Sequence, residues 1–245
     1  MSDLDGVREI HTNLLAYDNA QKIIATERLI RSLSPVFQLG RDSNVIDIGV
    51  GRGRFVVMLR ALSDCRISGI DDFADATYNY ESIDRAMRPF GIEMTKGDIM
   101  EPFPFDDQTF DLAVCFNTFE HLPASPRKVM REIYRILKPG GMCVIGMPNI
   151  LALYKRIRVL SGRTNLPRFD VWWTQHPWRG HIREAAPDEL REILIRSGFR
   201  AGQEIGIDCE LPNRMLRPAY LVYGAIVALA PRRLADVLFC AGIKS

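Results

Sequence analysis

The chain has 245 residues, of which 47% are hydrophobic and 25% charged, and its formal net charge is +2. These values are ordinary for a globular protein with one α/β domain, and they argue against a strongly basic nucleic-acid binder or an acidic tail. The five cysteines are an odd number without metal-knuckle spacing, so we interpret them as buried apolar side chains in a reducing compartment.

Membrane and secretion signals are weak in this sequence. The first residues are polar and acidic, which predicts no signal peptide. The most apolar stretch, 219–240, is interrupted by Pro231 and two arginines, and the run before this proline is too short to span a bilayer comfortably. We therefore expect a cytoplasmic protein with at most peripheral membrane contact.

The first two thirds of the chain alternate between strand and helix patterns. Residues 4–39 carry a helical apolar stripe and predict one or two helices. Strands are then expected at 45–48, 65–70, 92–95, 110–116 and 142–147, and helices at 55–62, 74–87 and 126–137. The sequence Lys138-Pro139-Gly140-Gly141 is typical of a helix stop. This alternation predicts an α/β fold with a doubly wound parallel sheet, whose ligand lies at the carboxyl edge of the strands.

The pattern changes after Pro148. We expect a helix at about 150–161, a long loop rich in arginine and aromatic residues, helices at 187–197 and 211–230, and strands at 199–207 and 237–243. We interpret the whole chain, 1–245, as a single domain. Its parts are N-terminal helices (1–40), a cofactor-binding core (41–149), a lid or acceptor insertion (150–186), and C-terminal helices and strands (187–245).

A glycine-rich turn follows the first predicted strand. Gly49, Gly51 and Gly53 lack Cβ atoms where the chain must turn sharply and let a ligand approach the backbone. The third glycine of the dinucleotide pattern G-x-G-x-x-G is replaced by Arg54, which disfavours a pyrophosphate site. The spacing G-x-G-x-G fits a ligand that has an amino-acid end, a ribose and an adenine but no phosphate.

Carboxylates stand where such a ligand needs acceptors. Asp47 ends the first strand and could brace the turn or accept from an ammonium group. Asp71 ends the second strand and could accept from both ribose hydroxyls, a role that Asp72 could share. Asp98 follows the third strand and could accept from the adenine amino group, beside Ile99. A glycine turn with acids at three strand ends predicts a nucleoside-binding site.

Four segments of the chain resemble a known family: VIDIGVGRGRF, ISGIDD, KGDIMEPFPFDDQTFDLAVCFNTFEHL and REIYRILKPGGMCVIGMPN. Over about Asp42 to Asn149 they are similar to the class I S-adenosylmethionine-dependent methyltransferases of the small-molecule type. The resemblance implies a Rossmann-like sheet of seven strands with the last antiparallel, a methyltransferase activity, and S-adenosyl-L-methionine as cofactor. It also implies that the residues named above and Asn117 lie near this cofactor.

Catalytic candidates follow the fourth strand and lie in the insertion. His121 is the first candidate for a general base or for a residue that orients the acceptor, with Glu120 beside it. His181 opens a second segment and is a candidate contact to the acceptor. His121 could equally cap the next turn and bond to backbone, and the segment that contains His181 could merely pack its own aromatic residues. A metal site built on Glu120 and His121 is conceivable, since some related O-methyltransferases use one. The sequence shows no standard ligand spacing, so we expect no metal.

The insertion is basic. The segment between Tyr154 and Arg183 contains seven lysines and arginines but only one acid, Asp170. This predicts either an anionic small-molecule acceptor or merely a solvated basic face, and no nucleic acid is expected. A homodimer through the apolar helix near the C-terminus is compatible with the sequence.

The predicted function is transfer of a methyl group to a small-molecule acceptor, with an oxygen of a sugar, lipid or other metabolite favoured over nitrogen or carbon. One alternative is a non-catalytic accessory protein that binds S-adenosylmethionine. A second is an NAD(P)-dependent oxidoreductase, which the arginine at position 54 disfavours.

Overall fold

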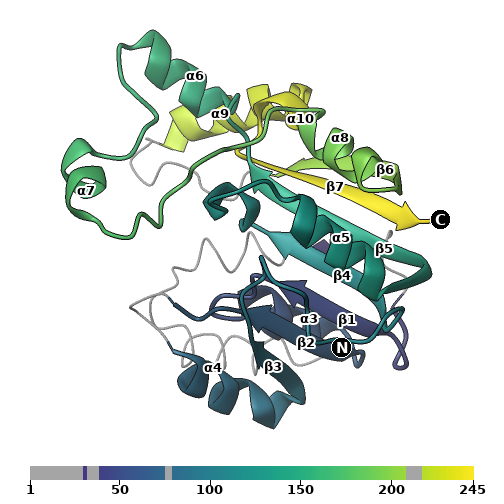
Figure 1. Ribbon diagram of the computed structural model, residues 1–245. Helices are drawn as coiled ribbons and strands as arrows, with labels where there is room; N and C mark the ends of the chain where they lie inside the picture. The colour runs from purple at the N-terminus through teal and green to yellow at the C-terminus, as the bar shows by residue number, and fades with distance from the viewer. Residues whose placement is uncertain (1–29, 32–38, 75–78, 208–216) are drawn as a thin grey trace.

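The computed structural model describes residues 30–31, 39–74, 79–207 and 217–245, and these form one seven-stranded sheet with helices around it (Figure 1). The strand order is β3-β2-β1-β4-β5-β7-β6. The strands are β1 (Asn44–Ile48), β2 (Arg66–Asp71), β3 (Ile92–Lys96), β4 (Phe110–Phe116), β5 (Leu137–Pro148), β6 (Phe199–Ile207) and β7 (Val237–Lys244).

Within the described sheet, six strands run in the same direction, and only β7 runs in the opposite direction. β1 pairs in parallel with β2 and β4, β2 with β3, and β4 with β5. β7 lies between β5 and β6 and is antiparallel to both. The predicted α/β sheet with an antiparallel last strand is therefore confirmed.

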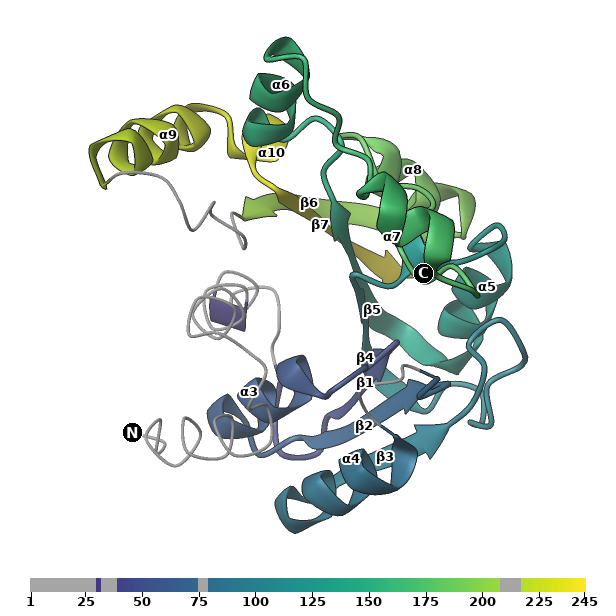
Figure 2. The same ribbon diagram turned by 90° about the vertical axis from the view of Figure 1, so that its left-hand side faces the viewer.

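Helices cover both faces of the sheet. In chain order they are α3 (Arg54–Leu62), α4 (Tyr80–Met87), η1 (Arg88–Phe90), η2 (Phe119–His121), α5 (Arg127–Ile136), α6 (Leu153–Leu160), α7 (Phe169–Thr174), α8 (Glu189–Arg196), α9 (Arg217–Leu229) and α10 (Pro231–Leu234). Figure 2 shows α3 on one face of the sheet and α5 and α8 on the other.

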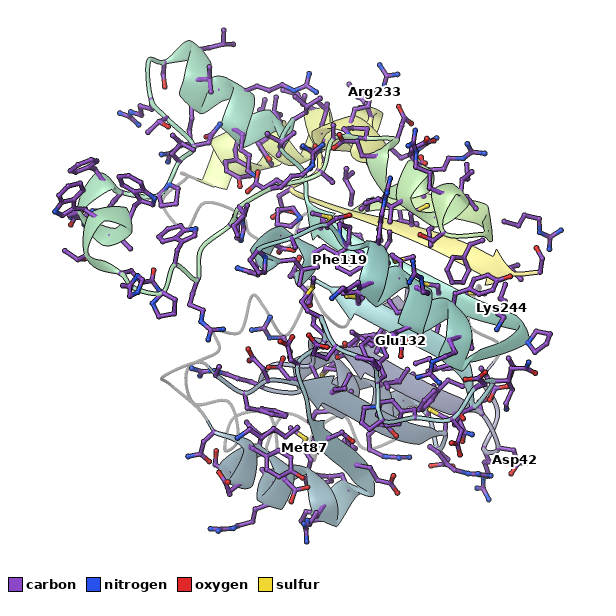
Figure 3. The ribbon with its side chains drawn as sticks, viewed as in Figure 1. Asp42, Met87, Phe119, Glu132, Arg233 and Lys244 are labelled. Atoms are coloured by element: carbon purple, nitrogen blue, oxygen red, sulfur yellow. The ribbon has the colours of Figure 1, made fainter. Side chains whose placement is uncertain are left out.

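Alternating strand residues build one core on each face. Val45 and Leu112 pack with the apolar residues of α3 and α4, whereas Ile46 and Ala113 pack with those of α5 and α8. This division follows from the two-residue period of a strand. Figure 3 marks Met87 in the first core and Phe119 in the second. A third, smaller cluster joins α9 and α10 to α6.

Several predicted boundaries were wrong. α4 begins at Tyr80 rather than at Ala74, because Asn79 caps it by accepting a hydrogen bond from Ser82 N (2.9 Å). β5 begins at Leu137 rather than at Met142, since Leu137 pairs with Phe110 and the Lys138–Gly141 segment forms an irregularity within the strand. α7 and α10 were not predicted as separate helices.

Other predictions are tested only in part. The predicted N-terminal helices lie mostly outside the described residues, as does the start of the helix predicted at 211–230, where the described helix is α9. Within the described residues, none of the helices has the length and apolarity that a membrane crossing requires.

Candidate functional site: the carboxyl edge of the sheet

The glycine turn lies between the carboxyl ends of β1 and β2. Gly49 N and Val50 N both donate to Ile70 O, at 2.9 and 3.2 Å, which ties the turn to the neighbouring strand. Gly49, Gly51 and Gly53 have φ angles of 76°, 53° and 78°, a region that favours glycine. A Cβ at Gly49 would lie 2.3 Å from Thr118 Oγ1, so this glycine also lets the turn pack against the end of β4.

Asp71 organises this turn from the end of β2. One carboxylate oxygen accepts from Gly51 N and the other from Phe73 N, both at 2.8 Å. Each oxygen keeps a lone pair, so the carboxylate can still accept from a ligand. Burial raises the pKa of Asp71, although the two backbone donors oppose the shift. The sequence predicted a ligand contact for Asp71 but not its hydrogen bonds to the backbone of Gly51 and Phe73.

Asp47 is a second carboxyl group beneath the turn. It is 4% exposed, and burial together with the charge of Asp71 raises its pKa to about 8. A cation bound here would favour the ionised form of Asp47 and lower this pKa. The chemistry of the site therefore fits a ligand with an ammonium group.

The remaining predicted cofactor residues lie along the same edge. Asp72 follows Asp71 and is exposed. Asp98 is exposed after β3, where its Oδ1 accepts from Met100 N at 2.8 Å, and Ile99 packs on the core beneath. Asn117 follows β4 with a φ of 51° and donates its backbone N–H to Gly146 O (2.9 Å). The turn, the acids and the strand ends thus fit the amino-acid, ribose and adenine parts of S-adenosylmethionine.

Glu120, His121 and His181 form a cluster beside this edge. Nε2 of each histidine lies 4.0 Å from Glu120 Oε1, and the two rings meet edge to face at 4.9 Å between centroids. The cluster is assembled by the backbone, because Ile182 N donates to Glu120 O at 2.6 Å and so docks the insertion onto η2. The structure thus brings together all three predicted catalytic residues.

Glu120 is the buried member of the cluster. Its exposed fraction is 0%, and among the described residues neither carboxylate oxygen has a hydrogen-bond partner. Burial raises its pKa to about 7. A buried carboxyl group without hydrogen bonds is disfavoured unless a proton or a cation compensates it.

Each histidine is held by its other ring nitrogen. His121 Nδ1 lies 2.9 Å from Arg179 O, and His181 Nδ1 lies 2.9 Å from Glu184 Oε1. The hydrogen bond to Glu184 raises the pKa of His181, whereas burial and the neighbouring His181 lower the pKa of His121.

Two residues that support the cluster were missed as site residues. Glu184 also pairs with Lys155 of α6, which is 4% exposed. Burial alone would raise the pKa of Glu184, but the hydrogen bonds from His181 and Lys155 outweigh it and lower this pKa. The only sequence signal was the position of Glu184 in the segment that His181 opens.

The basic residues of the insertion are largely engaged within the protein. Lys155 pairs with Glu184, Arg168 with Asp170, Arg179 with Asp72, and Arg183 with Glu189. The positive charge that faces an acceptor is therefore smaller than the sequence count suggests.

A hollow of about 1290 Å³ lies between α5 and α8 and extends to Phe119 of η2 and Ile182 of the insertion. Arg127, Arg131 and Arg196 line it, whereas Asp47, Asp71 and Asp98 do not. The hollow is therefore not the nucleoside site.

Known proteins share both the sequence motifs and the fold. A family described as "Methyltransferase domain" matches residues 46–145. The O-methyltransferase resE of Aspergillus sclerotiorum is 25% identical over 72% of this chain and 62% of its own length. The sarcosine/dimethylglycine N-methyltransferase of Halorhodospira halochloris is 30% identical over 58% of this chain and 51% of its own length. The chain thus spans less than two thirds of the length of both relatives.

A solved structure extends the likeness to the whole fold. The SAM-dependent methyltransferase from Archaeoglobus fulgidus has a TM-score of 0.59 and 20% identity, over 92% of this chain and 95% of that one. The matched family region contains the glycine turn, Asp71, Asp98 and the Glu120–His121 pair. In its motifs, its sheet topology and these likenesses, the chain is similar to the class I methyltransferases that depend on S-adenosyl-L-methionine, and residues 46–145 match the methyltransferase domain.

Proposed function

We propose that the protein transfers a methyl group from S-adenosyl-L-methionine to an oxygen of a small-molecule acceptor, such as a sugar, a lipid or another metabolite. The observation that carries this proposal is the Glu120–His121–His181 cluster, which lies beside the edge that holds the glycine turn. The O-methyltransferase name of one relative supports oxygen, although another relative is an N-methyltransferase.

The cofactor supplies an activated methyl group on a sulfonium sulfur. The residues at the strand ends hold its amino-acid, ribose and adenine parts, which fixes the direction of the methyl group. The insertion covers the acceptor and excludes water. Alignment of the acceptor oxygen with the S–CH3 bond provides much of the acceleration.

The cluster accounts for the proton of the acceptor. As the C–O bond forms, the electron pair of the C–S bond passes to sulfur, and the hydroxyl proton must leave. Nε2 of a neutral histidine accepts a proton, and Glu184 holds His181 in the tautomer that leaves Nε2 free for this role.

The first experiment is calorimetric titration with S-adenosylhomocysteine and, separately, with NADH. We expect S-adenosylhomocysteine to bind and NADH not to bind. Gly51→Val should abolish binding, because a β-branched residue is strained at a φ of 53° and its side chain enters the ligand space. Gly40→Val is the matched control, since a Cβ there has no neighbour within 4 Å. Binding of NADH alone would contradict the proposal.

A measurement of turnover shows whether the protein is an enzyme or a non-catalytic accessory protein. Acceptors with hydroxyl groups are screened for transfer of a labelled methyl group. We expect His121→Ala to lower turnover more than the affinity for S-adenosylhomocysteine. If His121→Ala retains full turnover, another residue activates the acceptor.

A further inference from the structure

Three potential ligand atoms converge at the cluster. A carboxylate oxygen of Glu120 and one ring nitrogen each of His121 and His181 lie within 4.8 Å of one another. In a tetrahedral site with bonds of about 2.0–2.2 Å, the donor atoms are roughly 3.3 Å apart. The observed Nε2–Oε1 distances of 4.0 Å are slightly longer, so small rotations of the two rings bring the atoms to coordination distance.

The hydrogen bonds around the histidines match those of metal-bound imidazoles. Arg179 O can only accept, so His121 Nδ1 donates to it and Nε2 keeps its lone pair. Glu184, paired with Lys155, accepts from His181 Nδ1 in the same way. A histidine that binds a metal usually donates its other N–H to a carboxylate or a backbone carbonyl, which fixes the tautomer and the ring orientation.

Glu120 supplies the independent evidence that something binds here. Its side chain is fully buried, and both carboxylate oxygens lack hydrogen-bond partners among the described residues. Lys155, the buried lysine of α6, is engaged by Glu184. Nε2 of each histidine lies 4.0 Å from Glu120 Oε1 and carries no hydrogen in this tautomer, so neither ring donates to the carboxylate while both are neutral. A cation between the three residues satisfies the carboxylate and both nitrogens together.

We propose that Glu120, His121 and His181 bind a divalent first-row transition metal ion. Two imidazoles and one carboxylate suit such ions, whereas Mg²⁺ and Ca²⁺ prefer oxygen ligands. Three protein ligands leave coordination positions open for the oxygen atoms of the acceptor. This inference rests on the proposed function and replaces one step of it: with both Nε2 atoms bound to the ion, the histidines no longer accept the proton of the acceptor. The ion would orient the acceptor and lower the pKa of its hydroxyl group, which then releases its proton to water.

The sequence indicated only part of this site, because a metal held by Glu120 and His121 was conceivable but His181 was not among its ligands. Glu120 and His121 are adjacent, which is not a standard ligand spacing, and the expectation from the sequence was that no metal binds. The third ligand comes from the insertion and reaches the pair only because Ile182 N bonds to Glu120 O.

The test is titration of untagged, chelator-treated protein with Co²⁺, followed by visible absorption and by calorimetry. We expect one Co²⁺ per chain with ligand-field bands. Glu120→Gln and His181→Ala should lower the affinity at least about 100-fold, and Glu184→Gln about 10–100-fold because it acts through His181. His176→Ala is the matched control, since His176 is an exposed histidine of the same insertion outside the cluster. It should bind Co²⁺ like the wild type.

The possible outcomes test the ion site and the proposed methyltransferase function independently of each other. Titration of every variant with S-adenosylhomocysteine shows whether its fold is intact. Absence of Co²⁺ binding in the wild type, or unchanged binding in Glu120→Gln and His181→Ala, overturns the ion site, and a proton then neutralises Glu120. If S-adenosylhomocysteine binds in that case, the proposed function survives. Co²⁺ binding without S-adenosylhomocysteine binding supports the ion site and contradicts the proposed function.

Discussion

Asp47 links cofactor binding to pH. Its pKa of about 8 is raised by burial and by Asp71, so it is largely protonated at pH 6 in the free protein. The ammonium group of the cofactor favours the ionised form, so binding releases a proton. We therefore expect the affinity for S-adenosylhomocysteine to rise between pH 6 and 8, by up to about tenfold per pH unit, and to level off above pH 8.

Calorimetry at several pH values in buffers of different ionisation enthalpy measures both the affinity and the released proton. Asp47→Asn should remove most of this pH dependence. A flat profile for the wild type would show that no ionised Asp47 is needed.

Gly49 fixes the contact between the glycine turn and the end of β4. Its φ is 76°, and a Cβ would lie 2.3 Å from Thr118 Oγ1, which donates to Phe116 O at 3.1 Å. Gly49→Ala should therefore lower the free energy of unfolding by about 1–3 kcal/mol. Gly40→Ala, where a Cβ has open space, should change it by less than about 0.5 kcal/mol. Urea unfolding of both variants measures this difference. Equal unfolding midpoints would contradict the prediction that a side chain at position 49 is strained.

At the scale of elements, the segment after α7 connects two parts of the proposed site. Arg179 Nη1 lies 3.4 Å from Asp72 Oδ2 after β2, and its carbonyl accepts from His121 of η2. An exposed ion pair contributes at most about 1 kcal/mol. Arg179→Ala should thus speed the dissociation of S-adenosylhomocysteine by up to about fivefold.

Stopped-flow displacement measures this rate. The matched control is Arg183→Ala, because Arg183 belongs to the same insertion but pairs with Glu189 of α8. Equal acceleration in both variants would indicate a general loosening of the insertion rather than a link to Asp72.

Elements with a plain pattern were predictable. β4 and β6 match their predicted bounds to the residue, because each is an apolar run or alternation between clear breaks. α7 could not be predicted, since none of its residues is buried and its aromatic side chains follow no core-facing period. β5 was predicted too short, because a Lys-Pro-Gly-Gly sequence favours a break and the pairing of Leu137 with Phe110 overrides it.

At the scale of the whole molecule, the topology explains which parts of the site the sequence could indicate. Parallel strands bring their carboxyl ends to one edge, so Asp47, Asp71 and Asp98 could be grouped from their positions after strands. His181 follows no strand end, and its place depends on the path of the insertion. The contacts of Glu184 and Lys155 depend on the same path, so the sequence could not predict them either.

The insertion has a further property that follows from where its aromatic residues lie. The chain has three tryptophans, and all of them, Trp172, Trp173 and Trp178, belong to α7 or to the loop after it. Trp172 and Trp173 are 54% and 71% exposed. Intrinsic tryptophan fluorescence therefore originates from this insertion alone, and Trp172 and Trp173 contribute the red-shifted emission of hydrated indoles. A blue shift or quenching of this emission on ligand addition would therefore report a change in the environment of the insertion, without any attached dye.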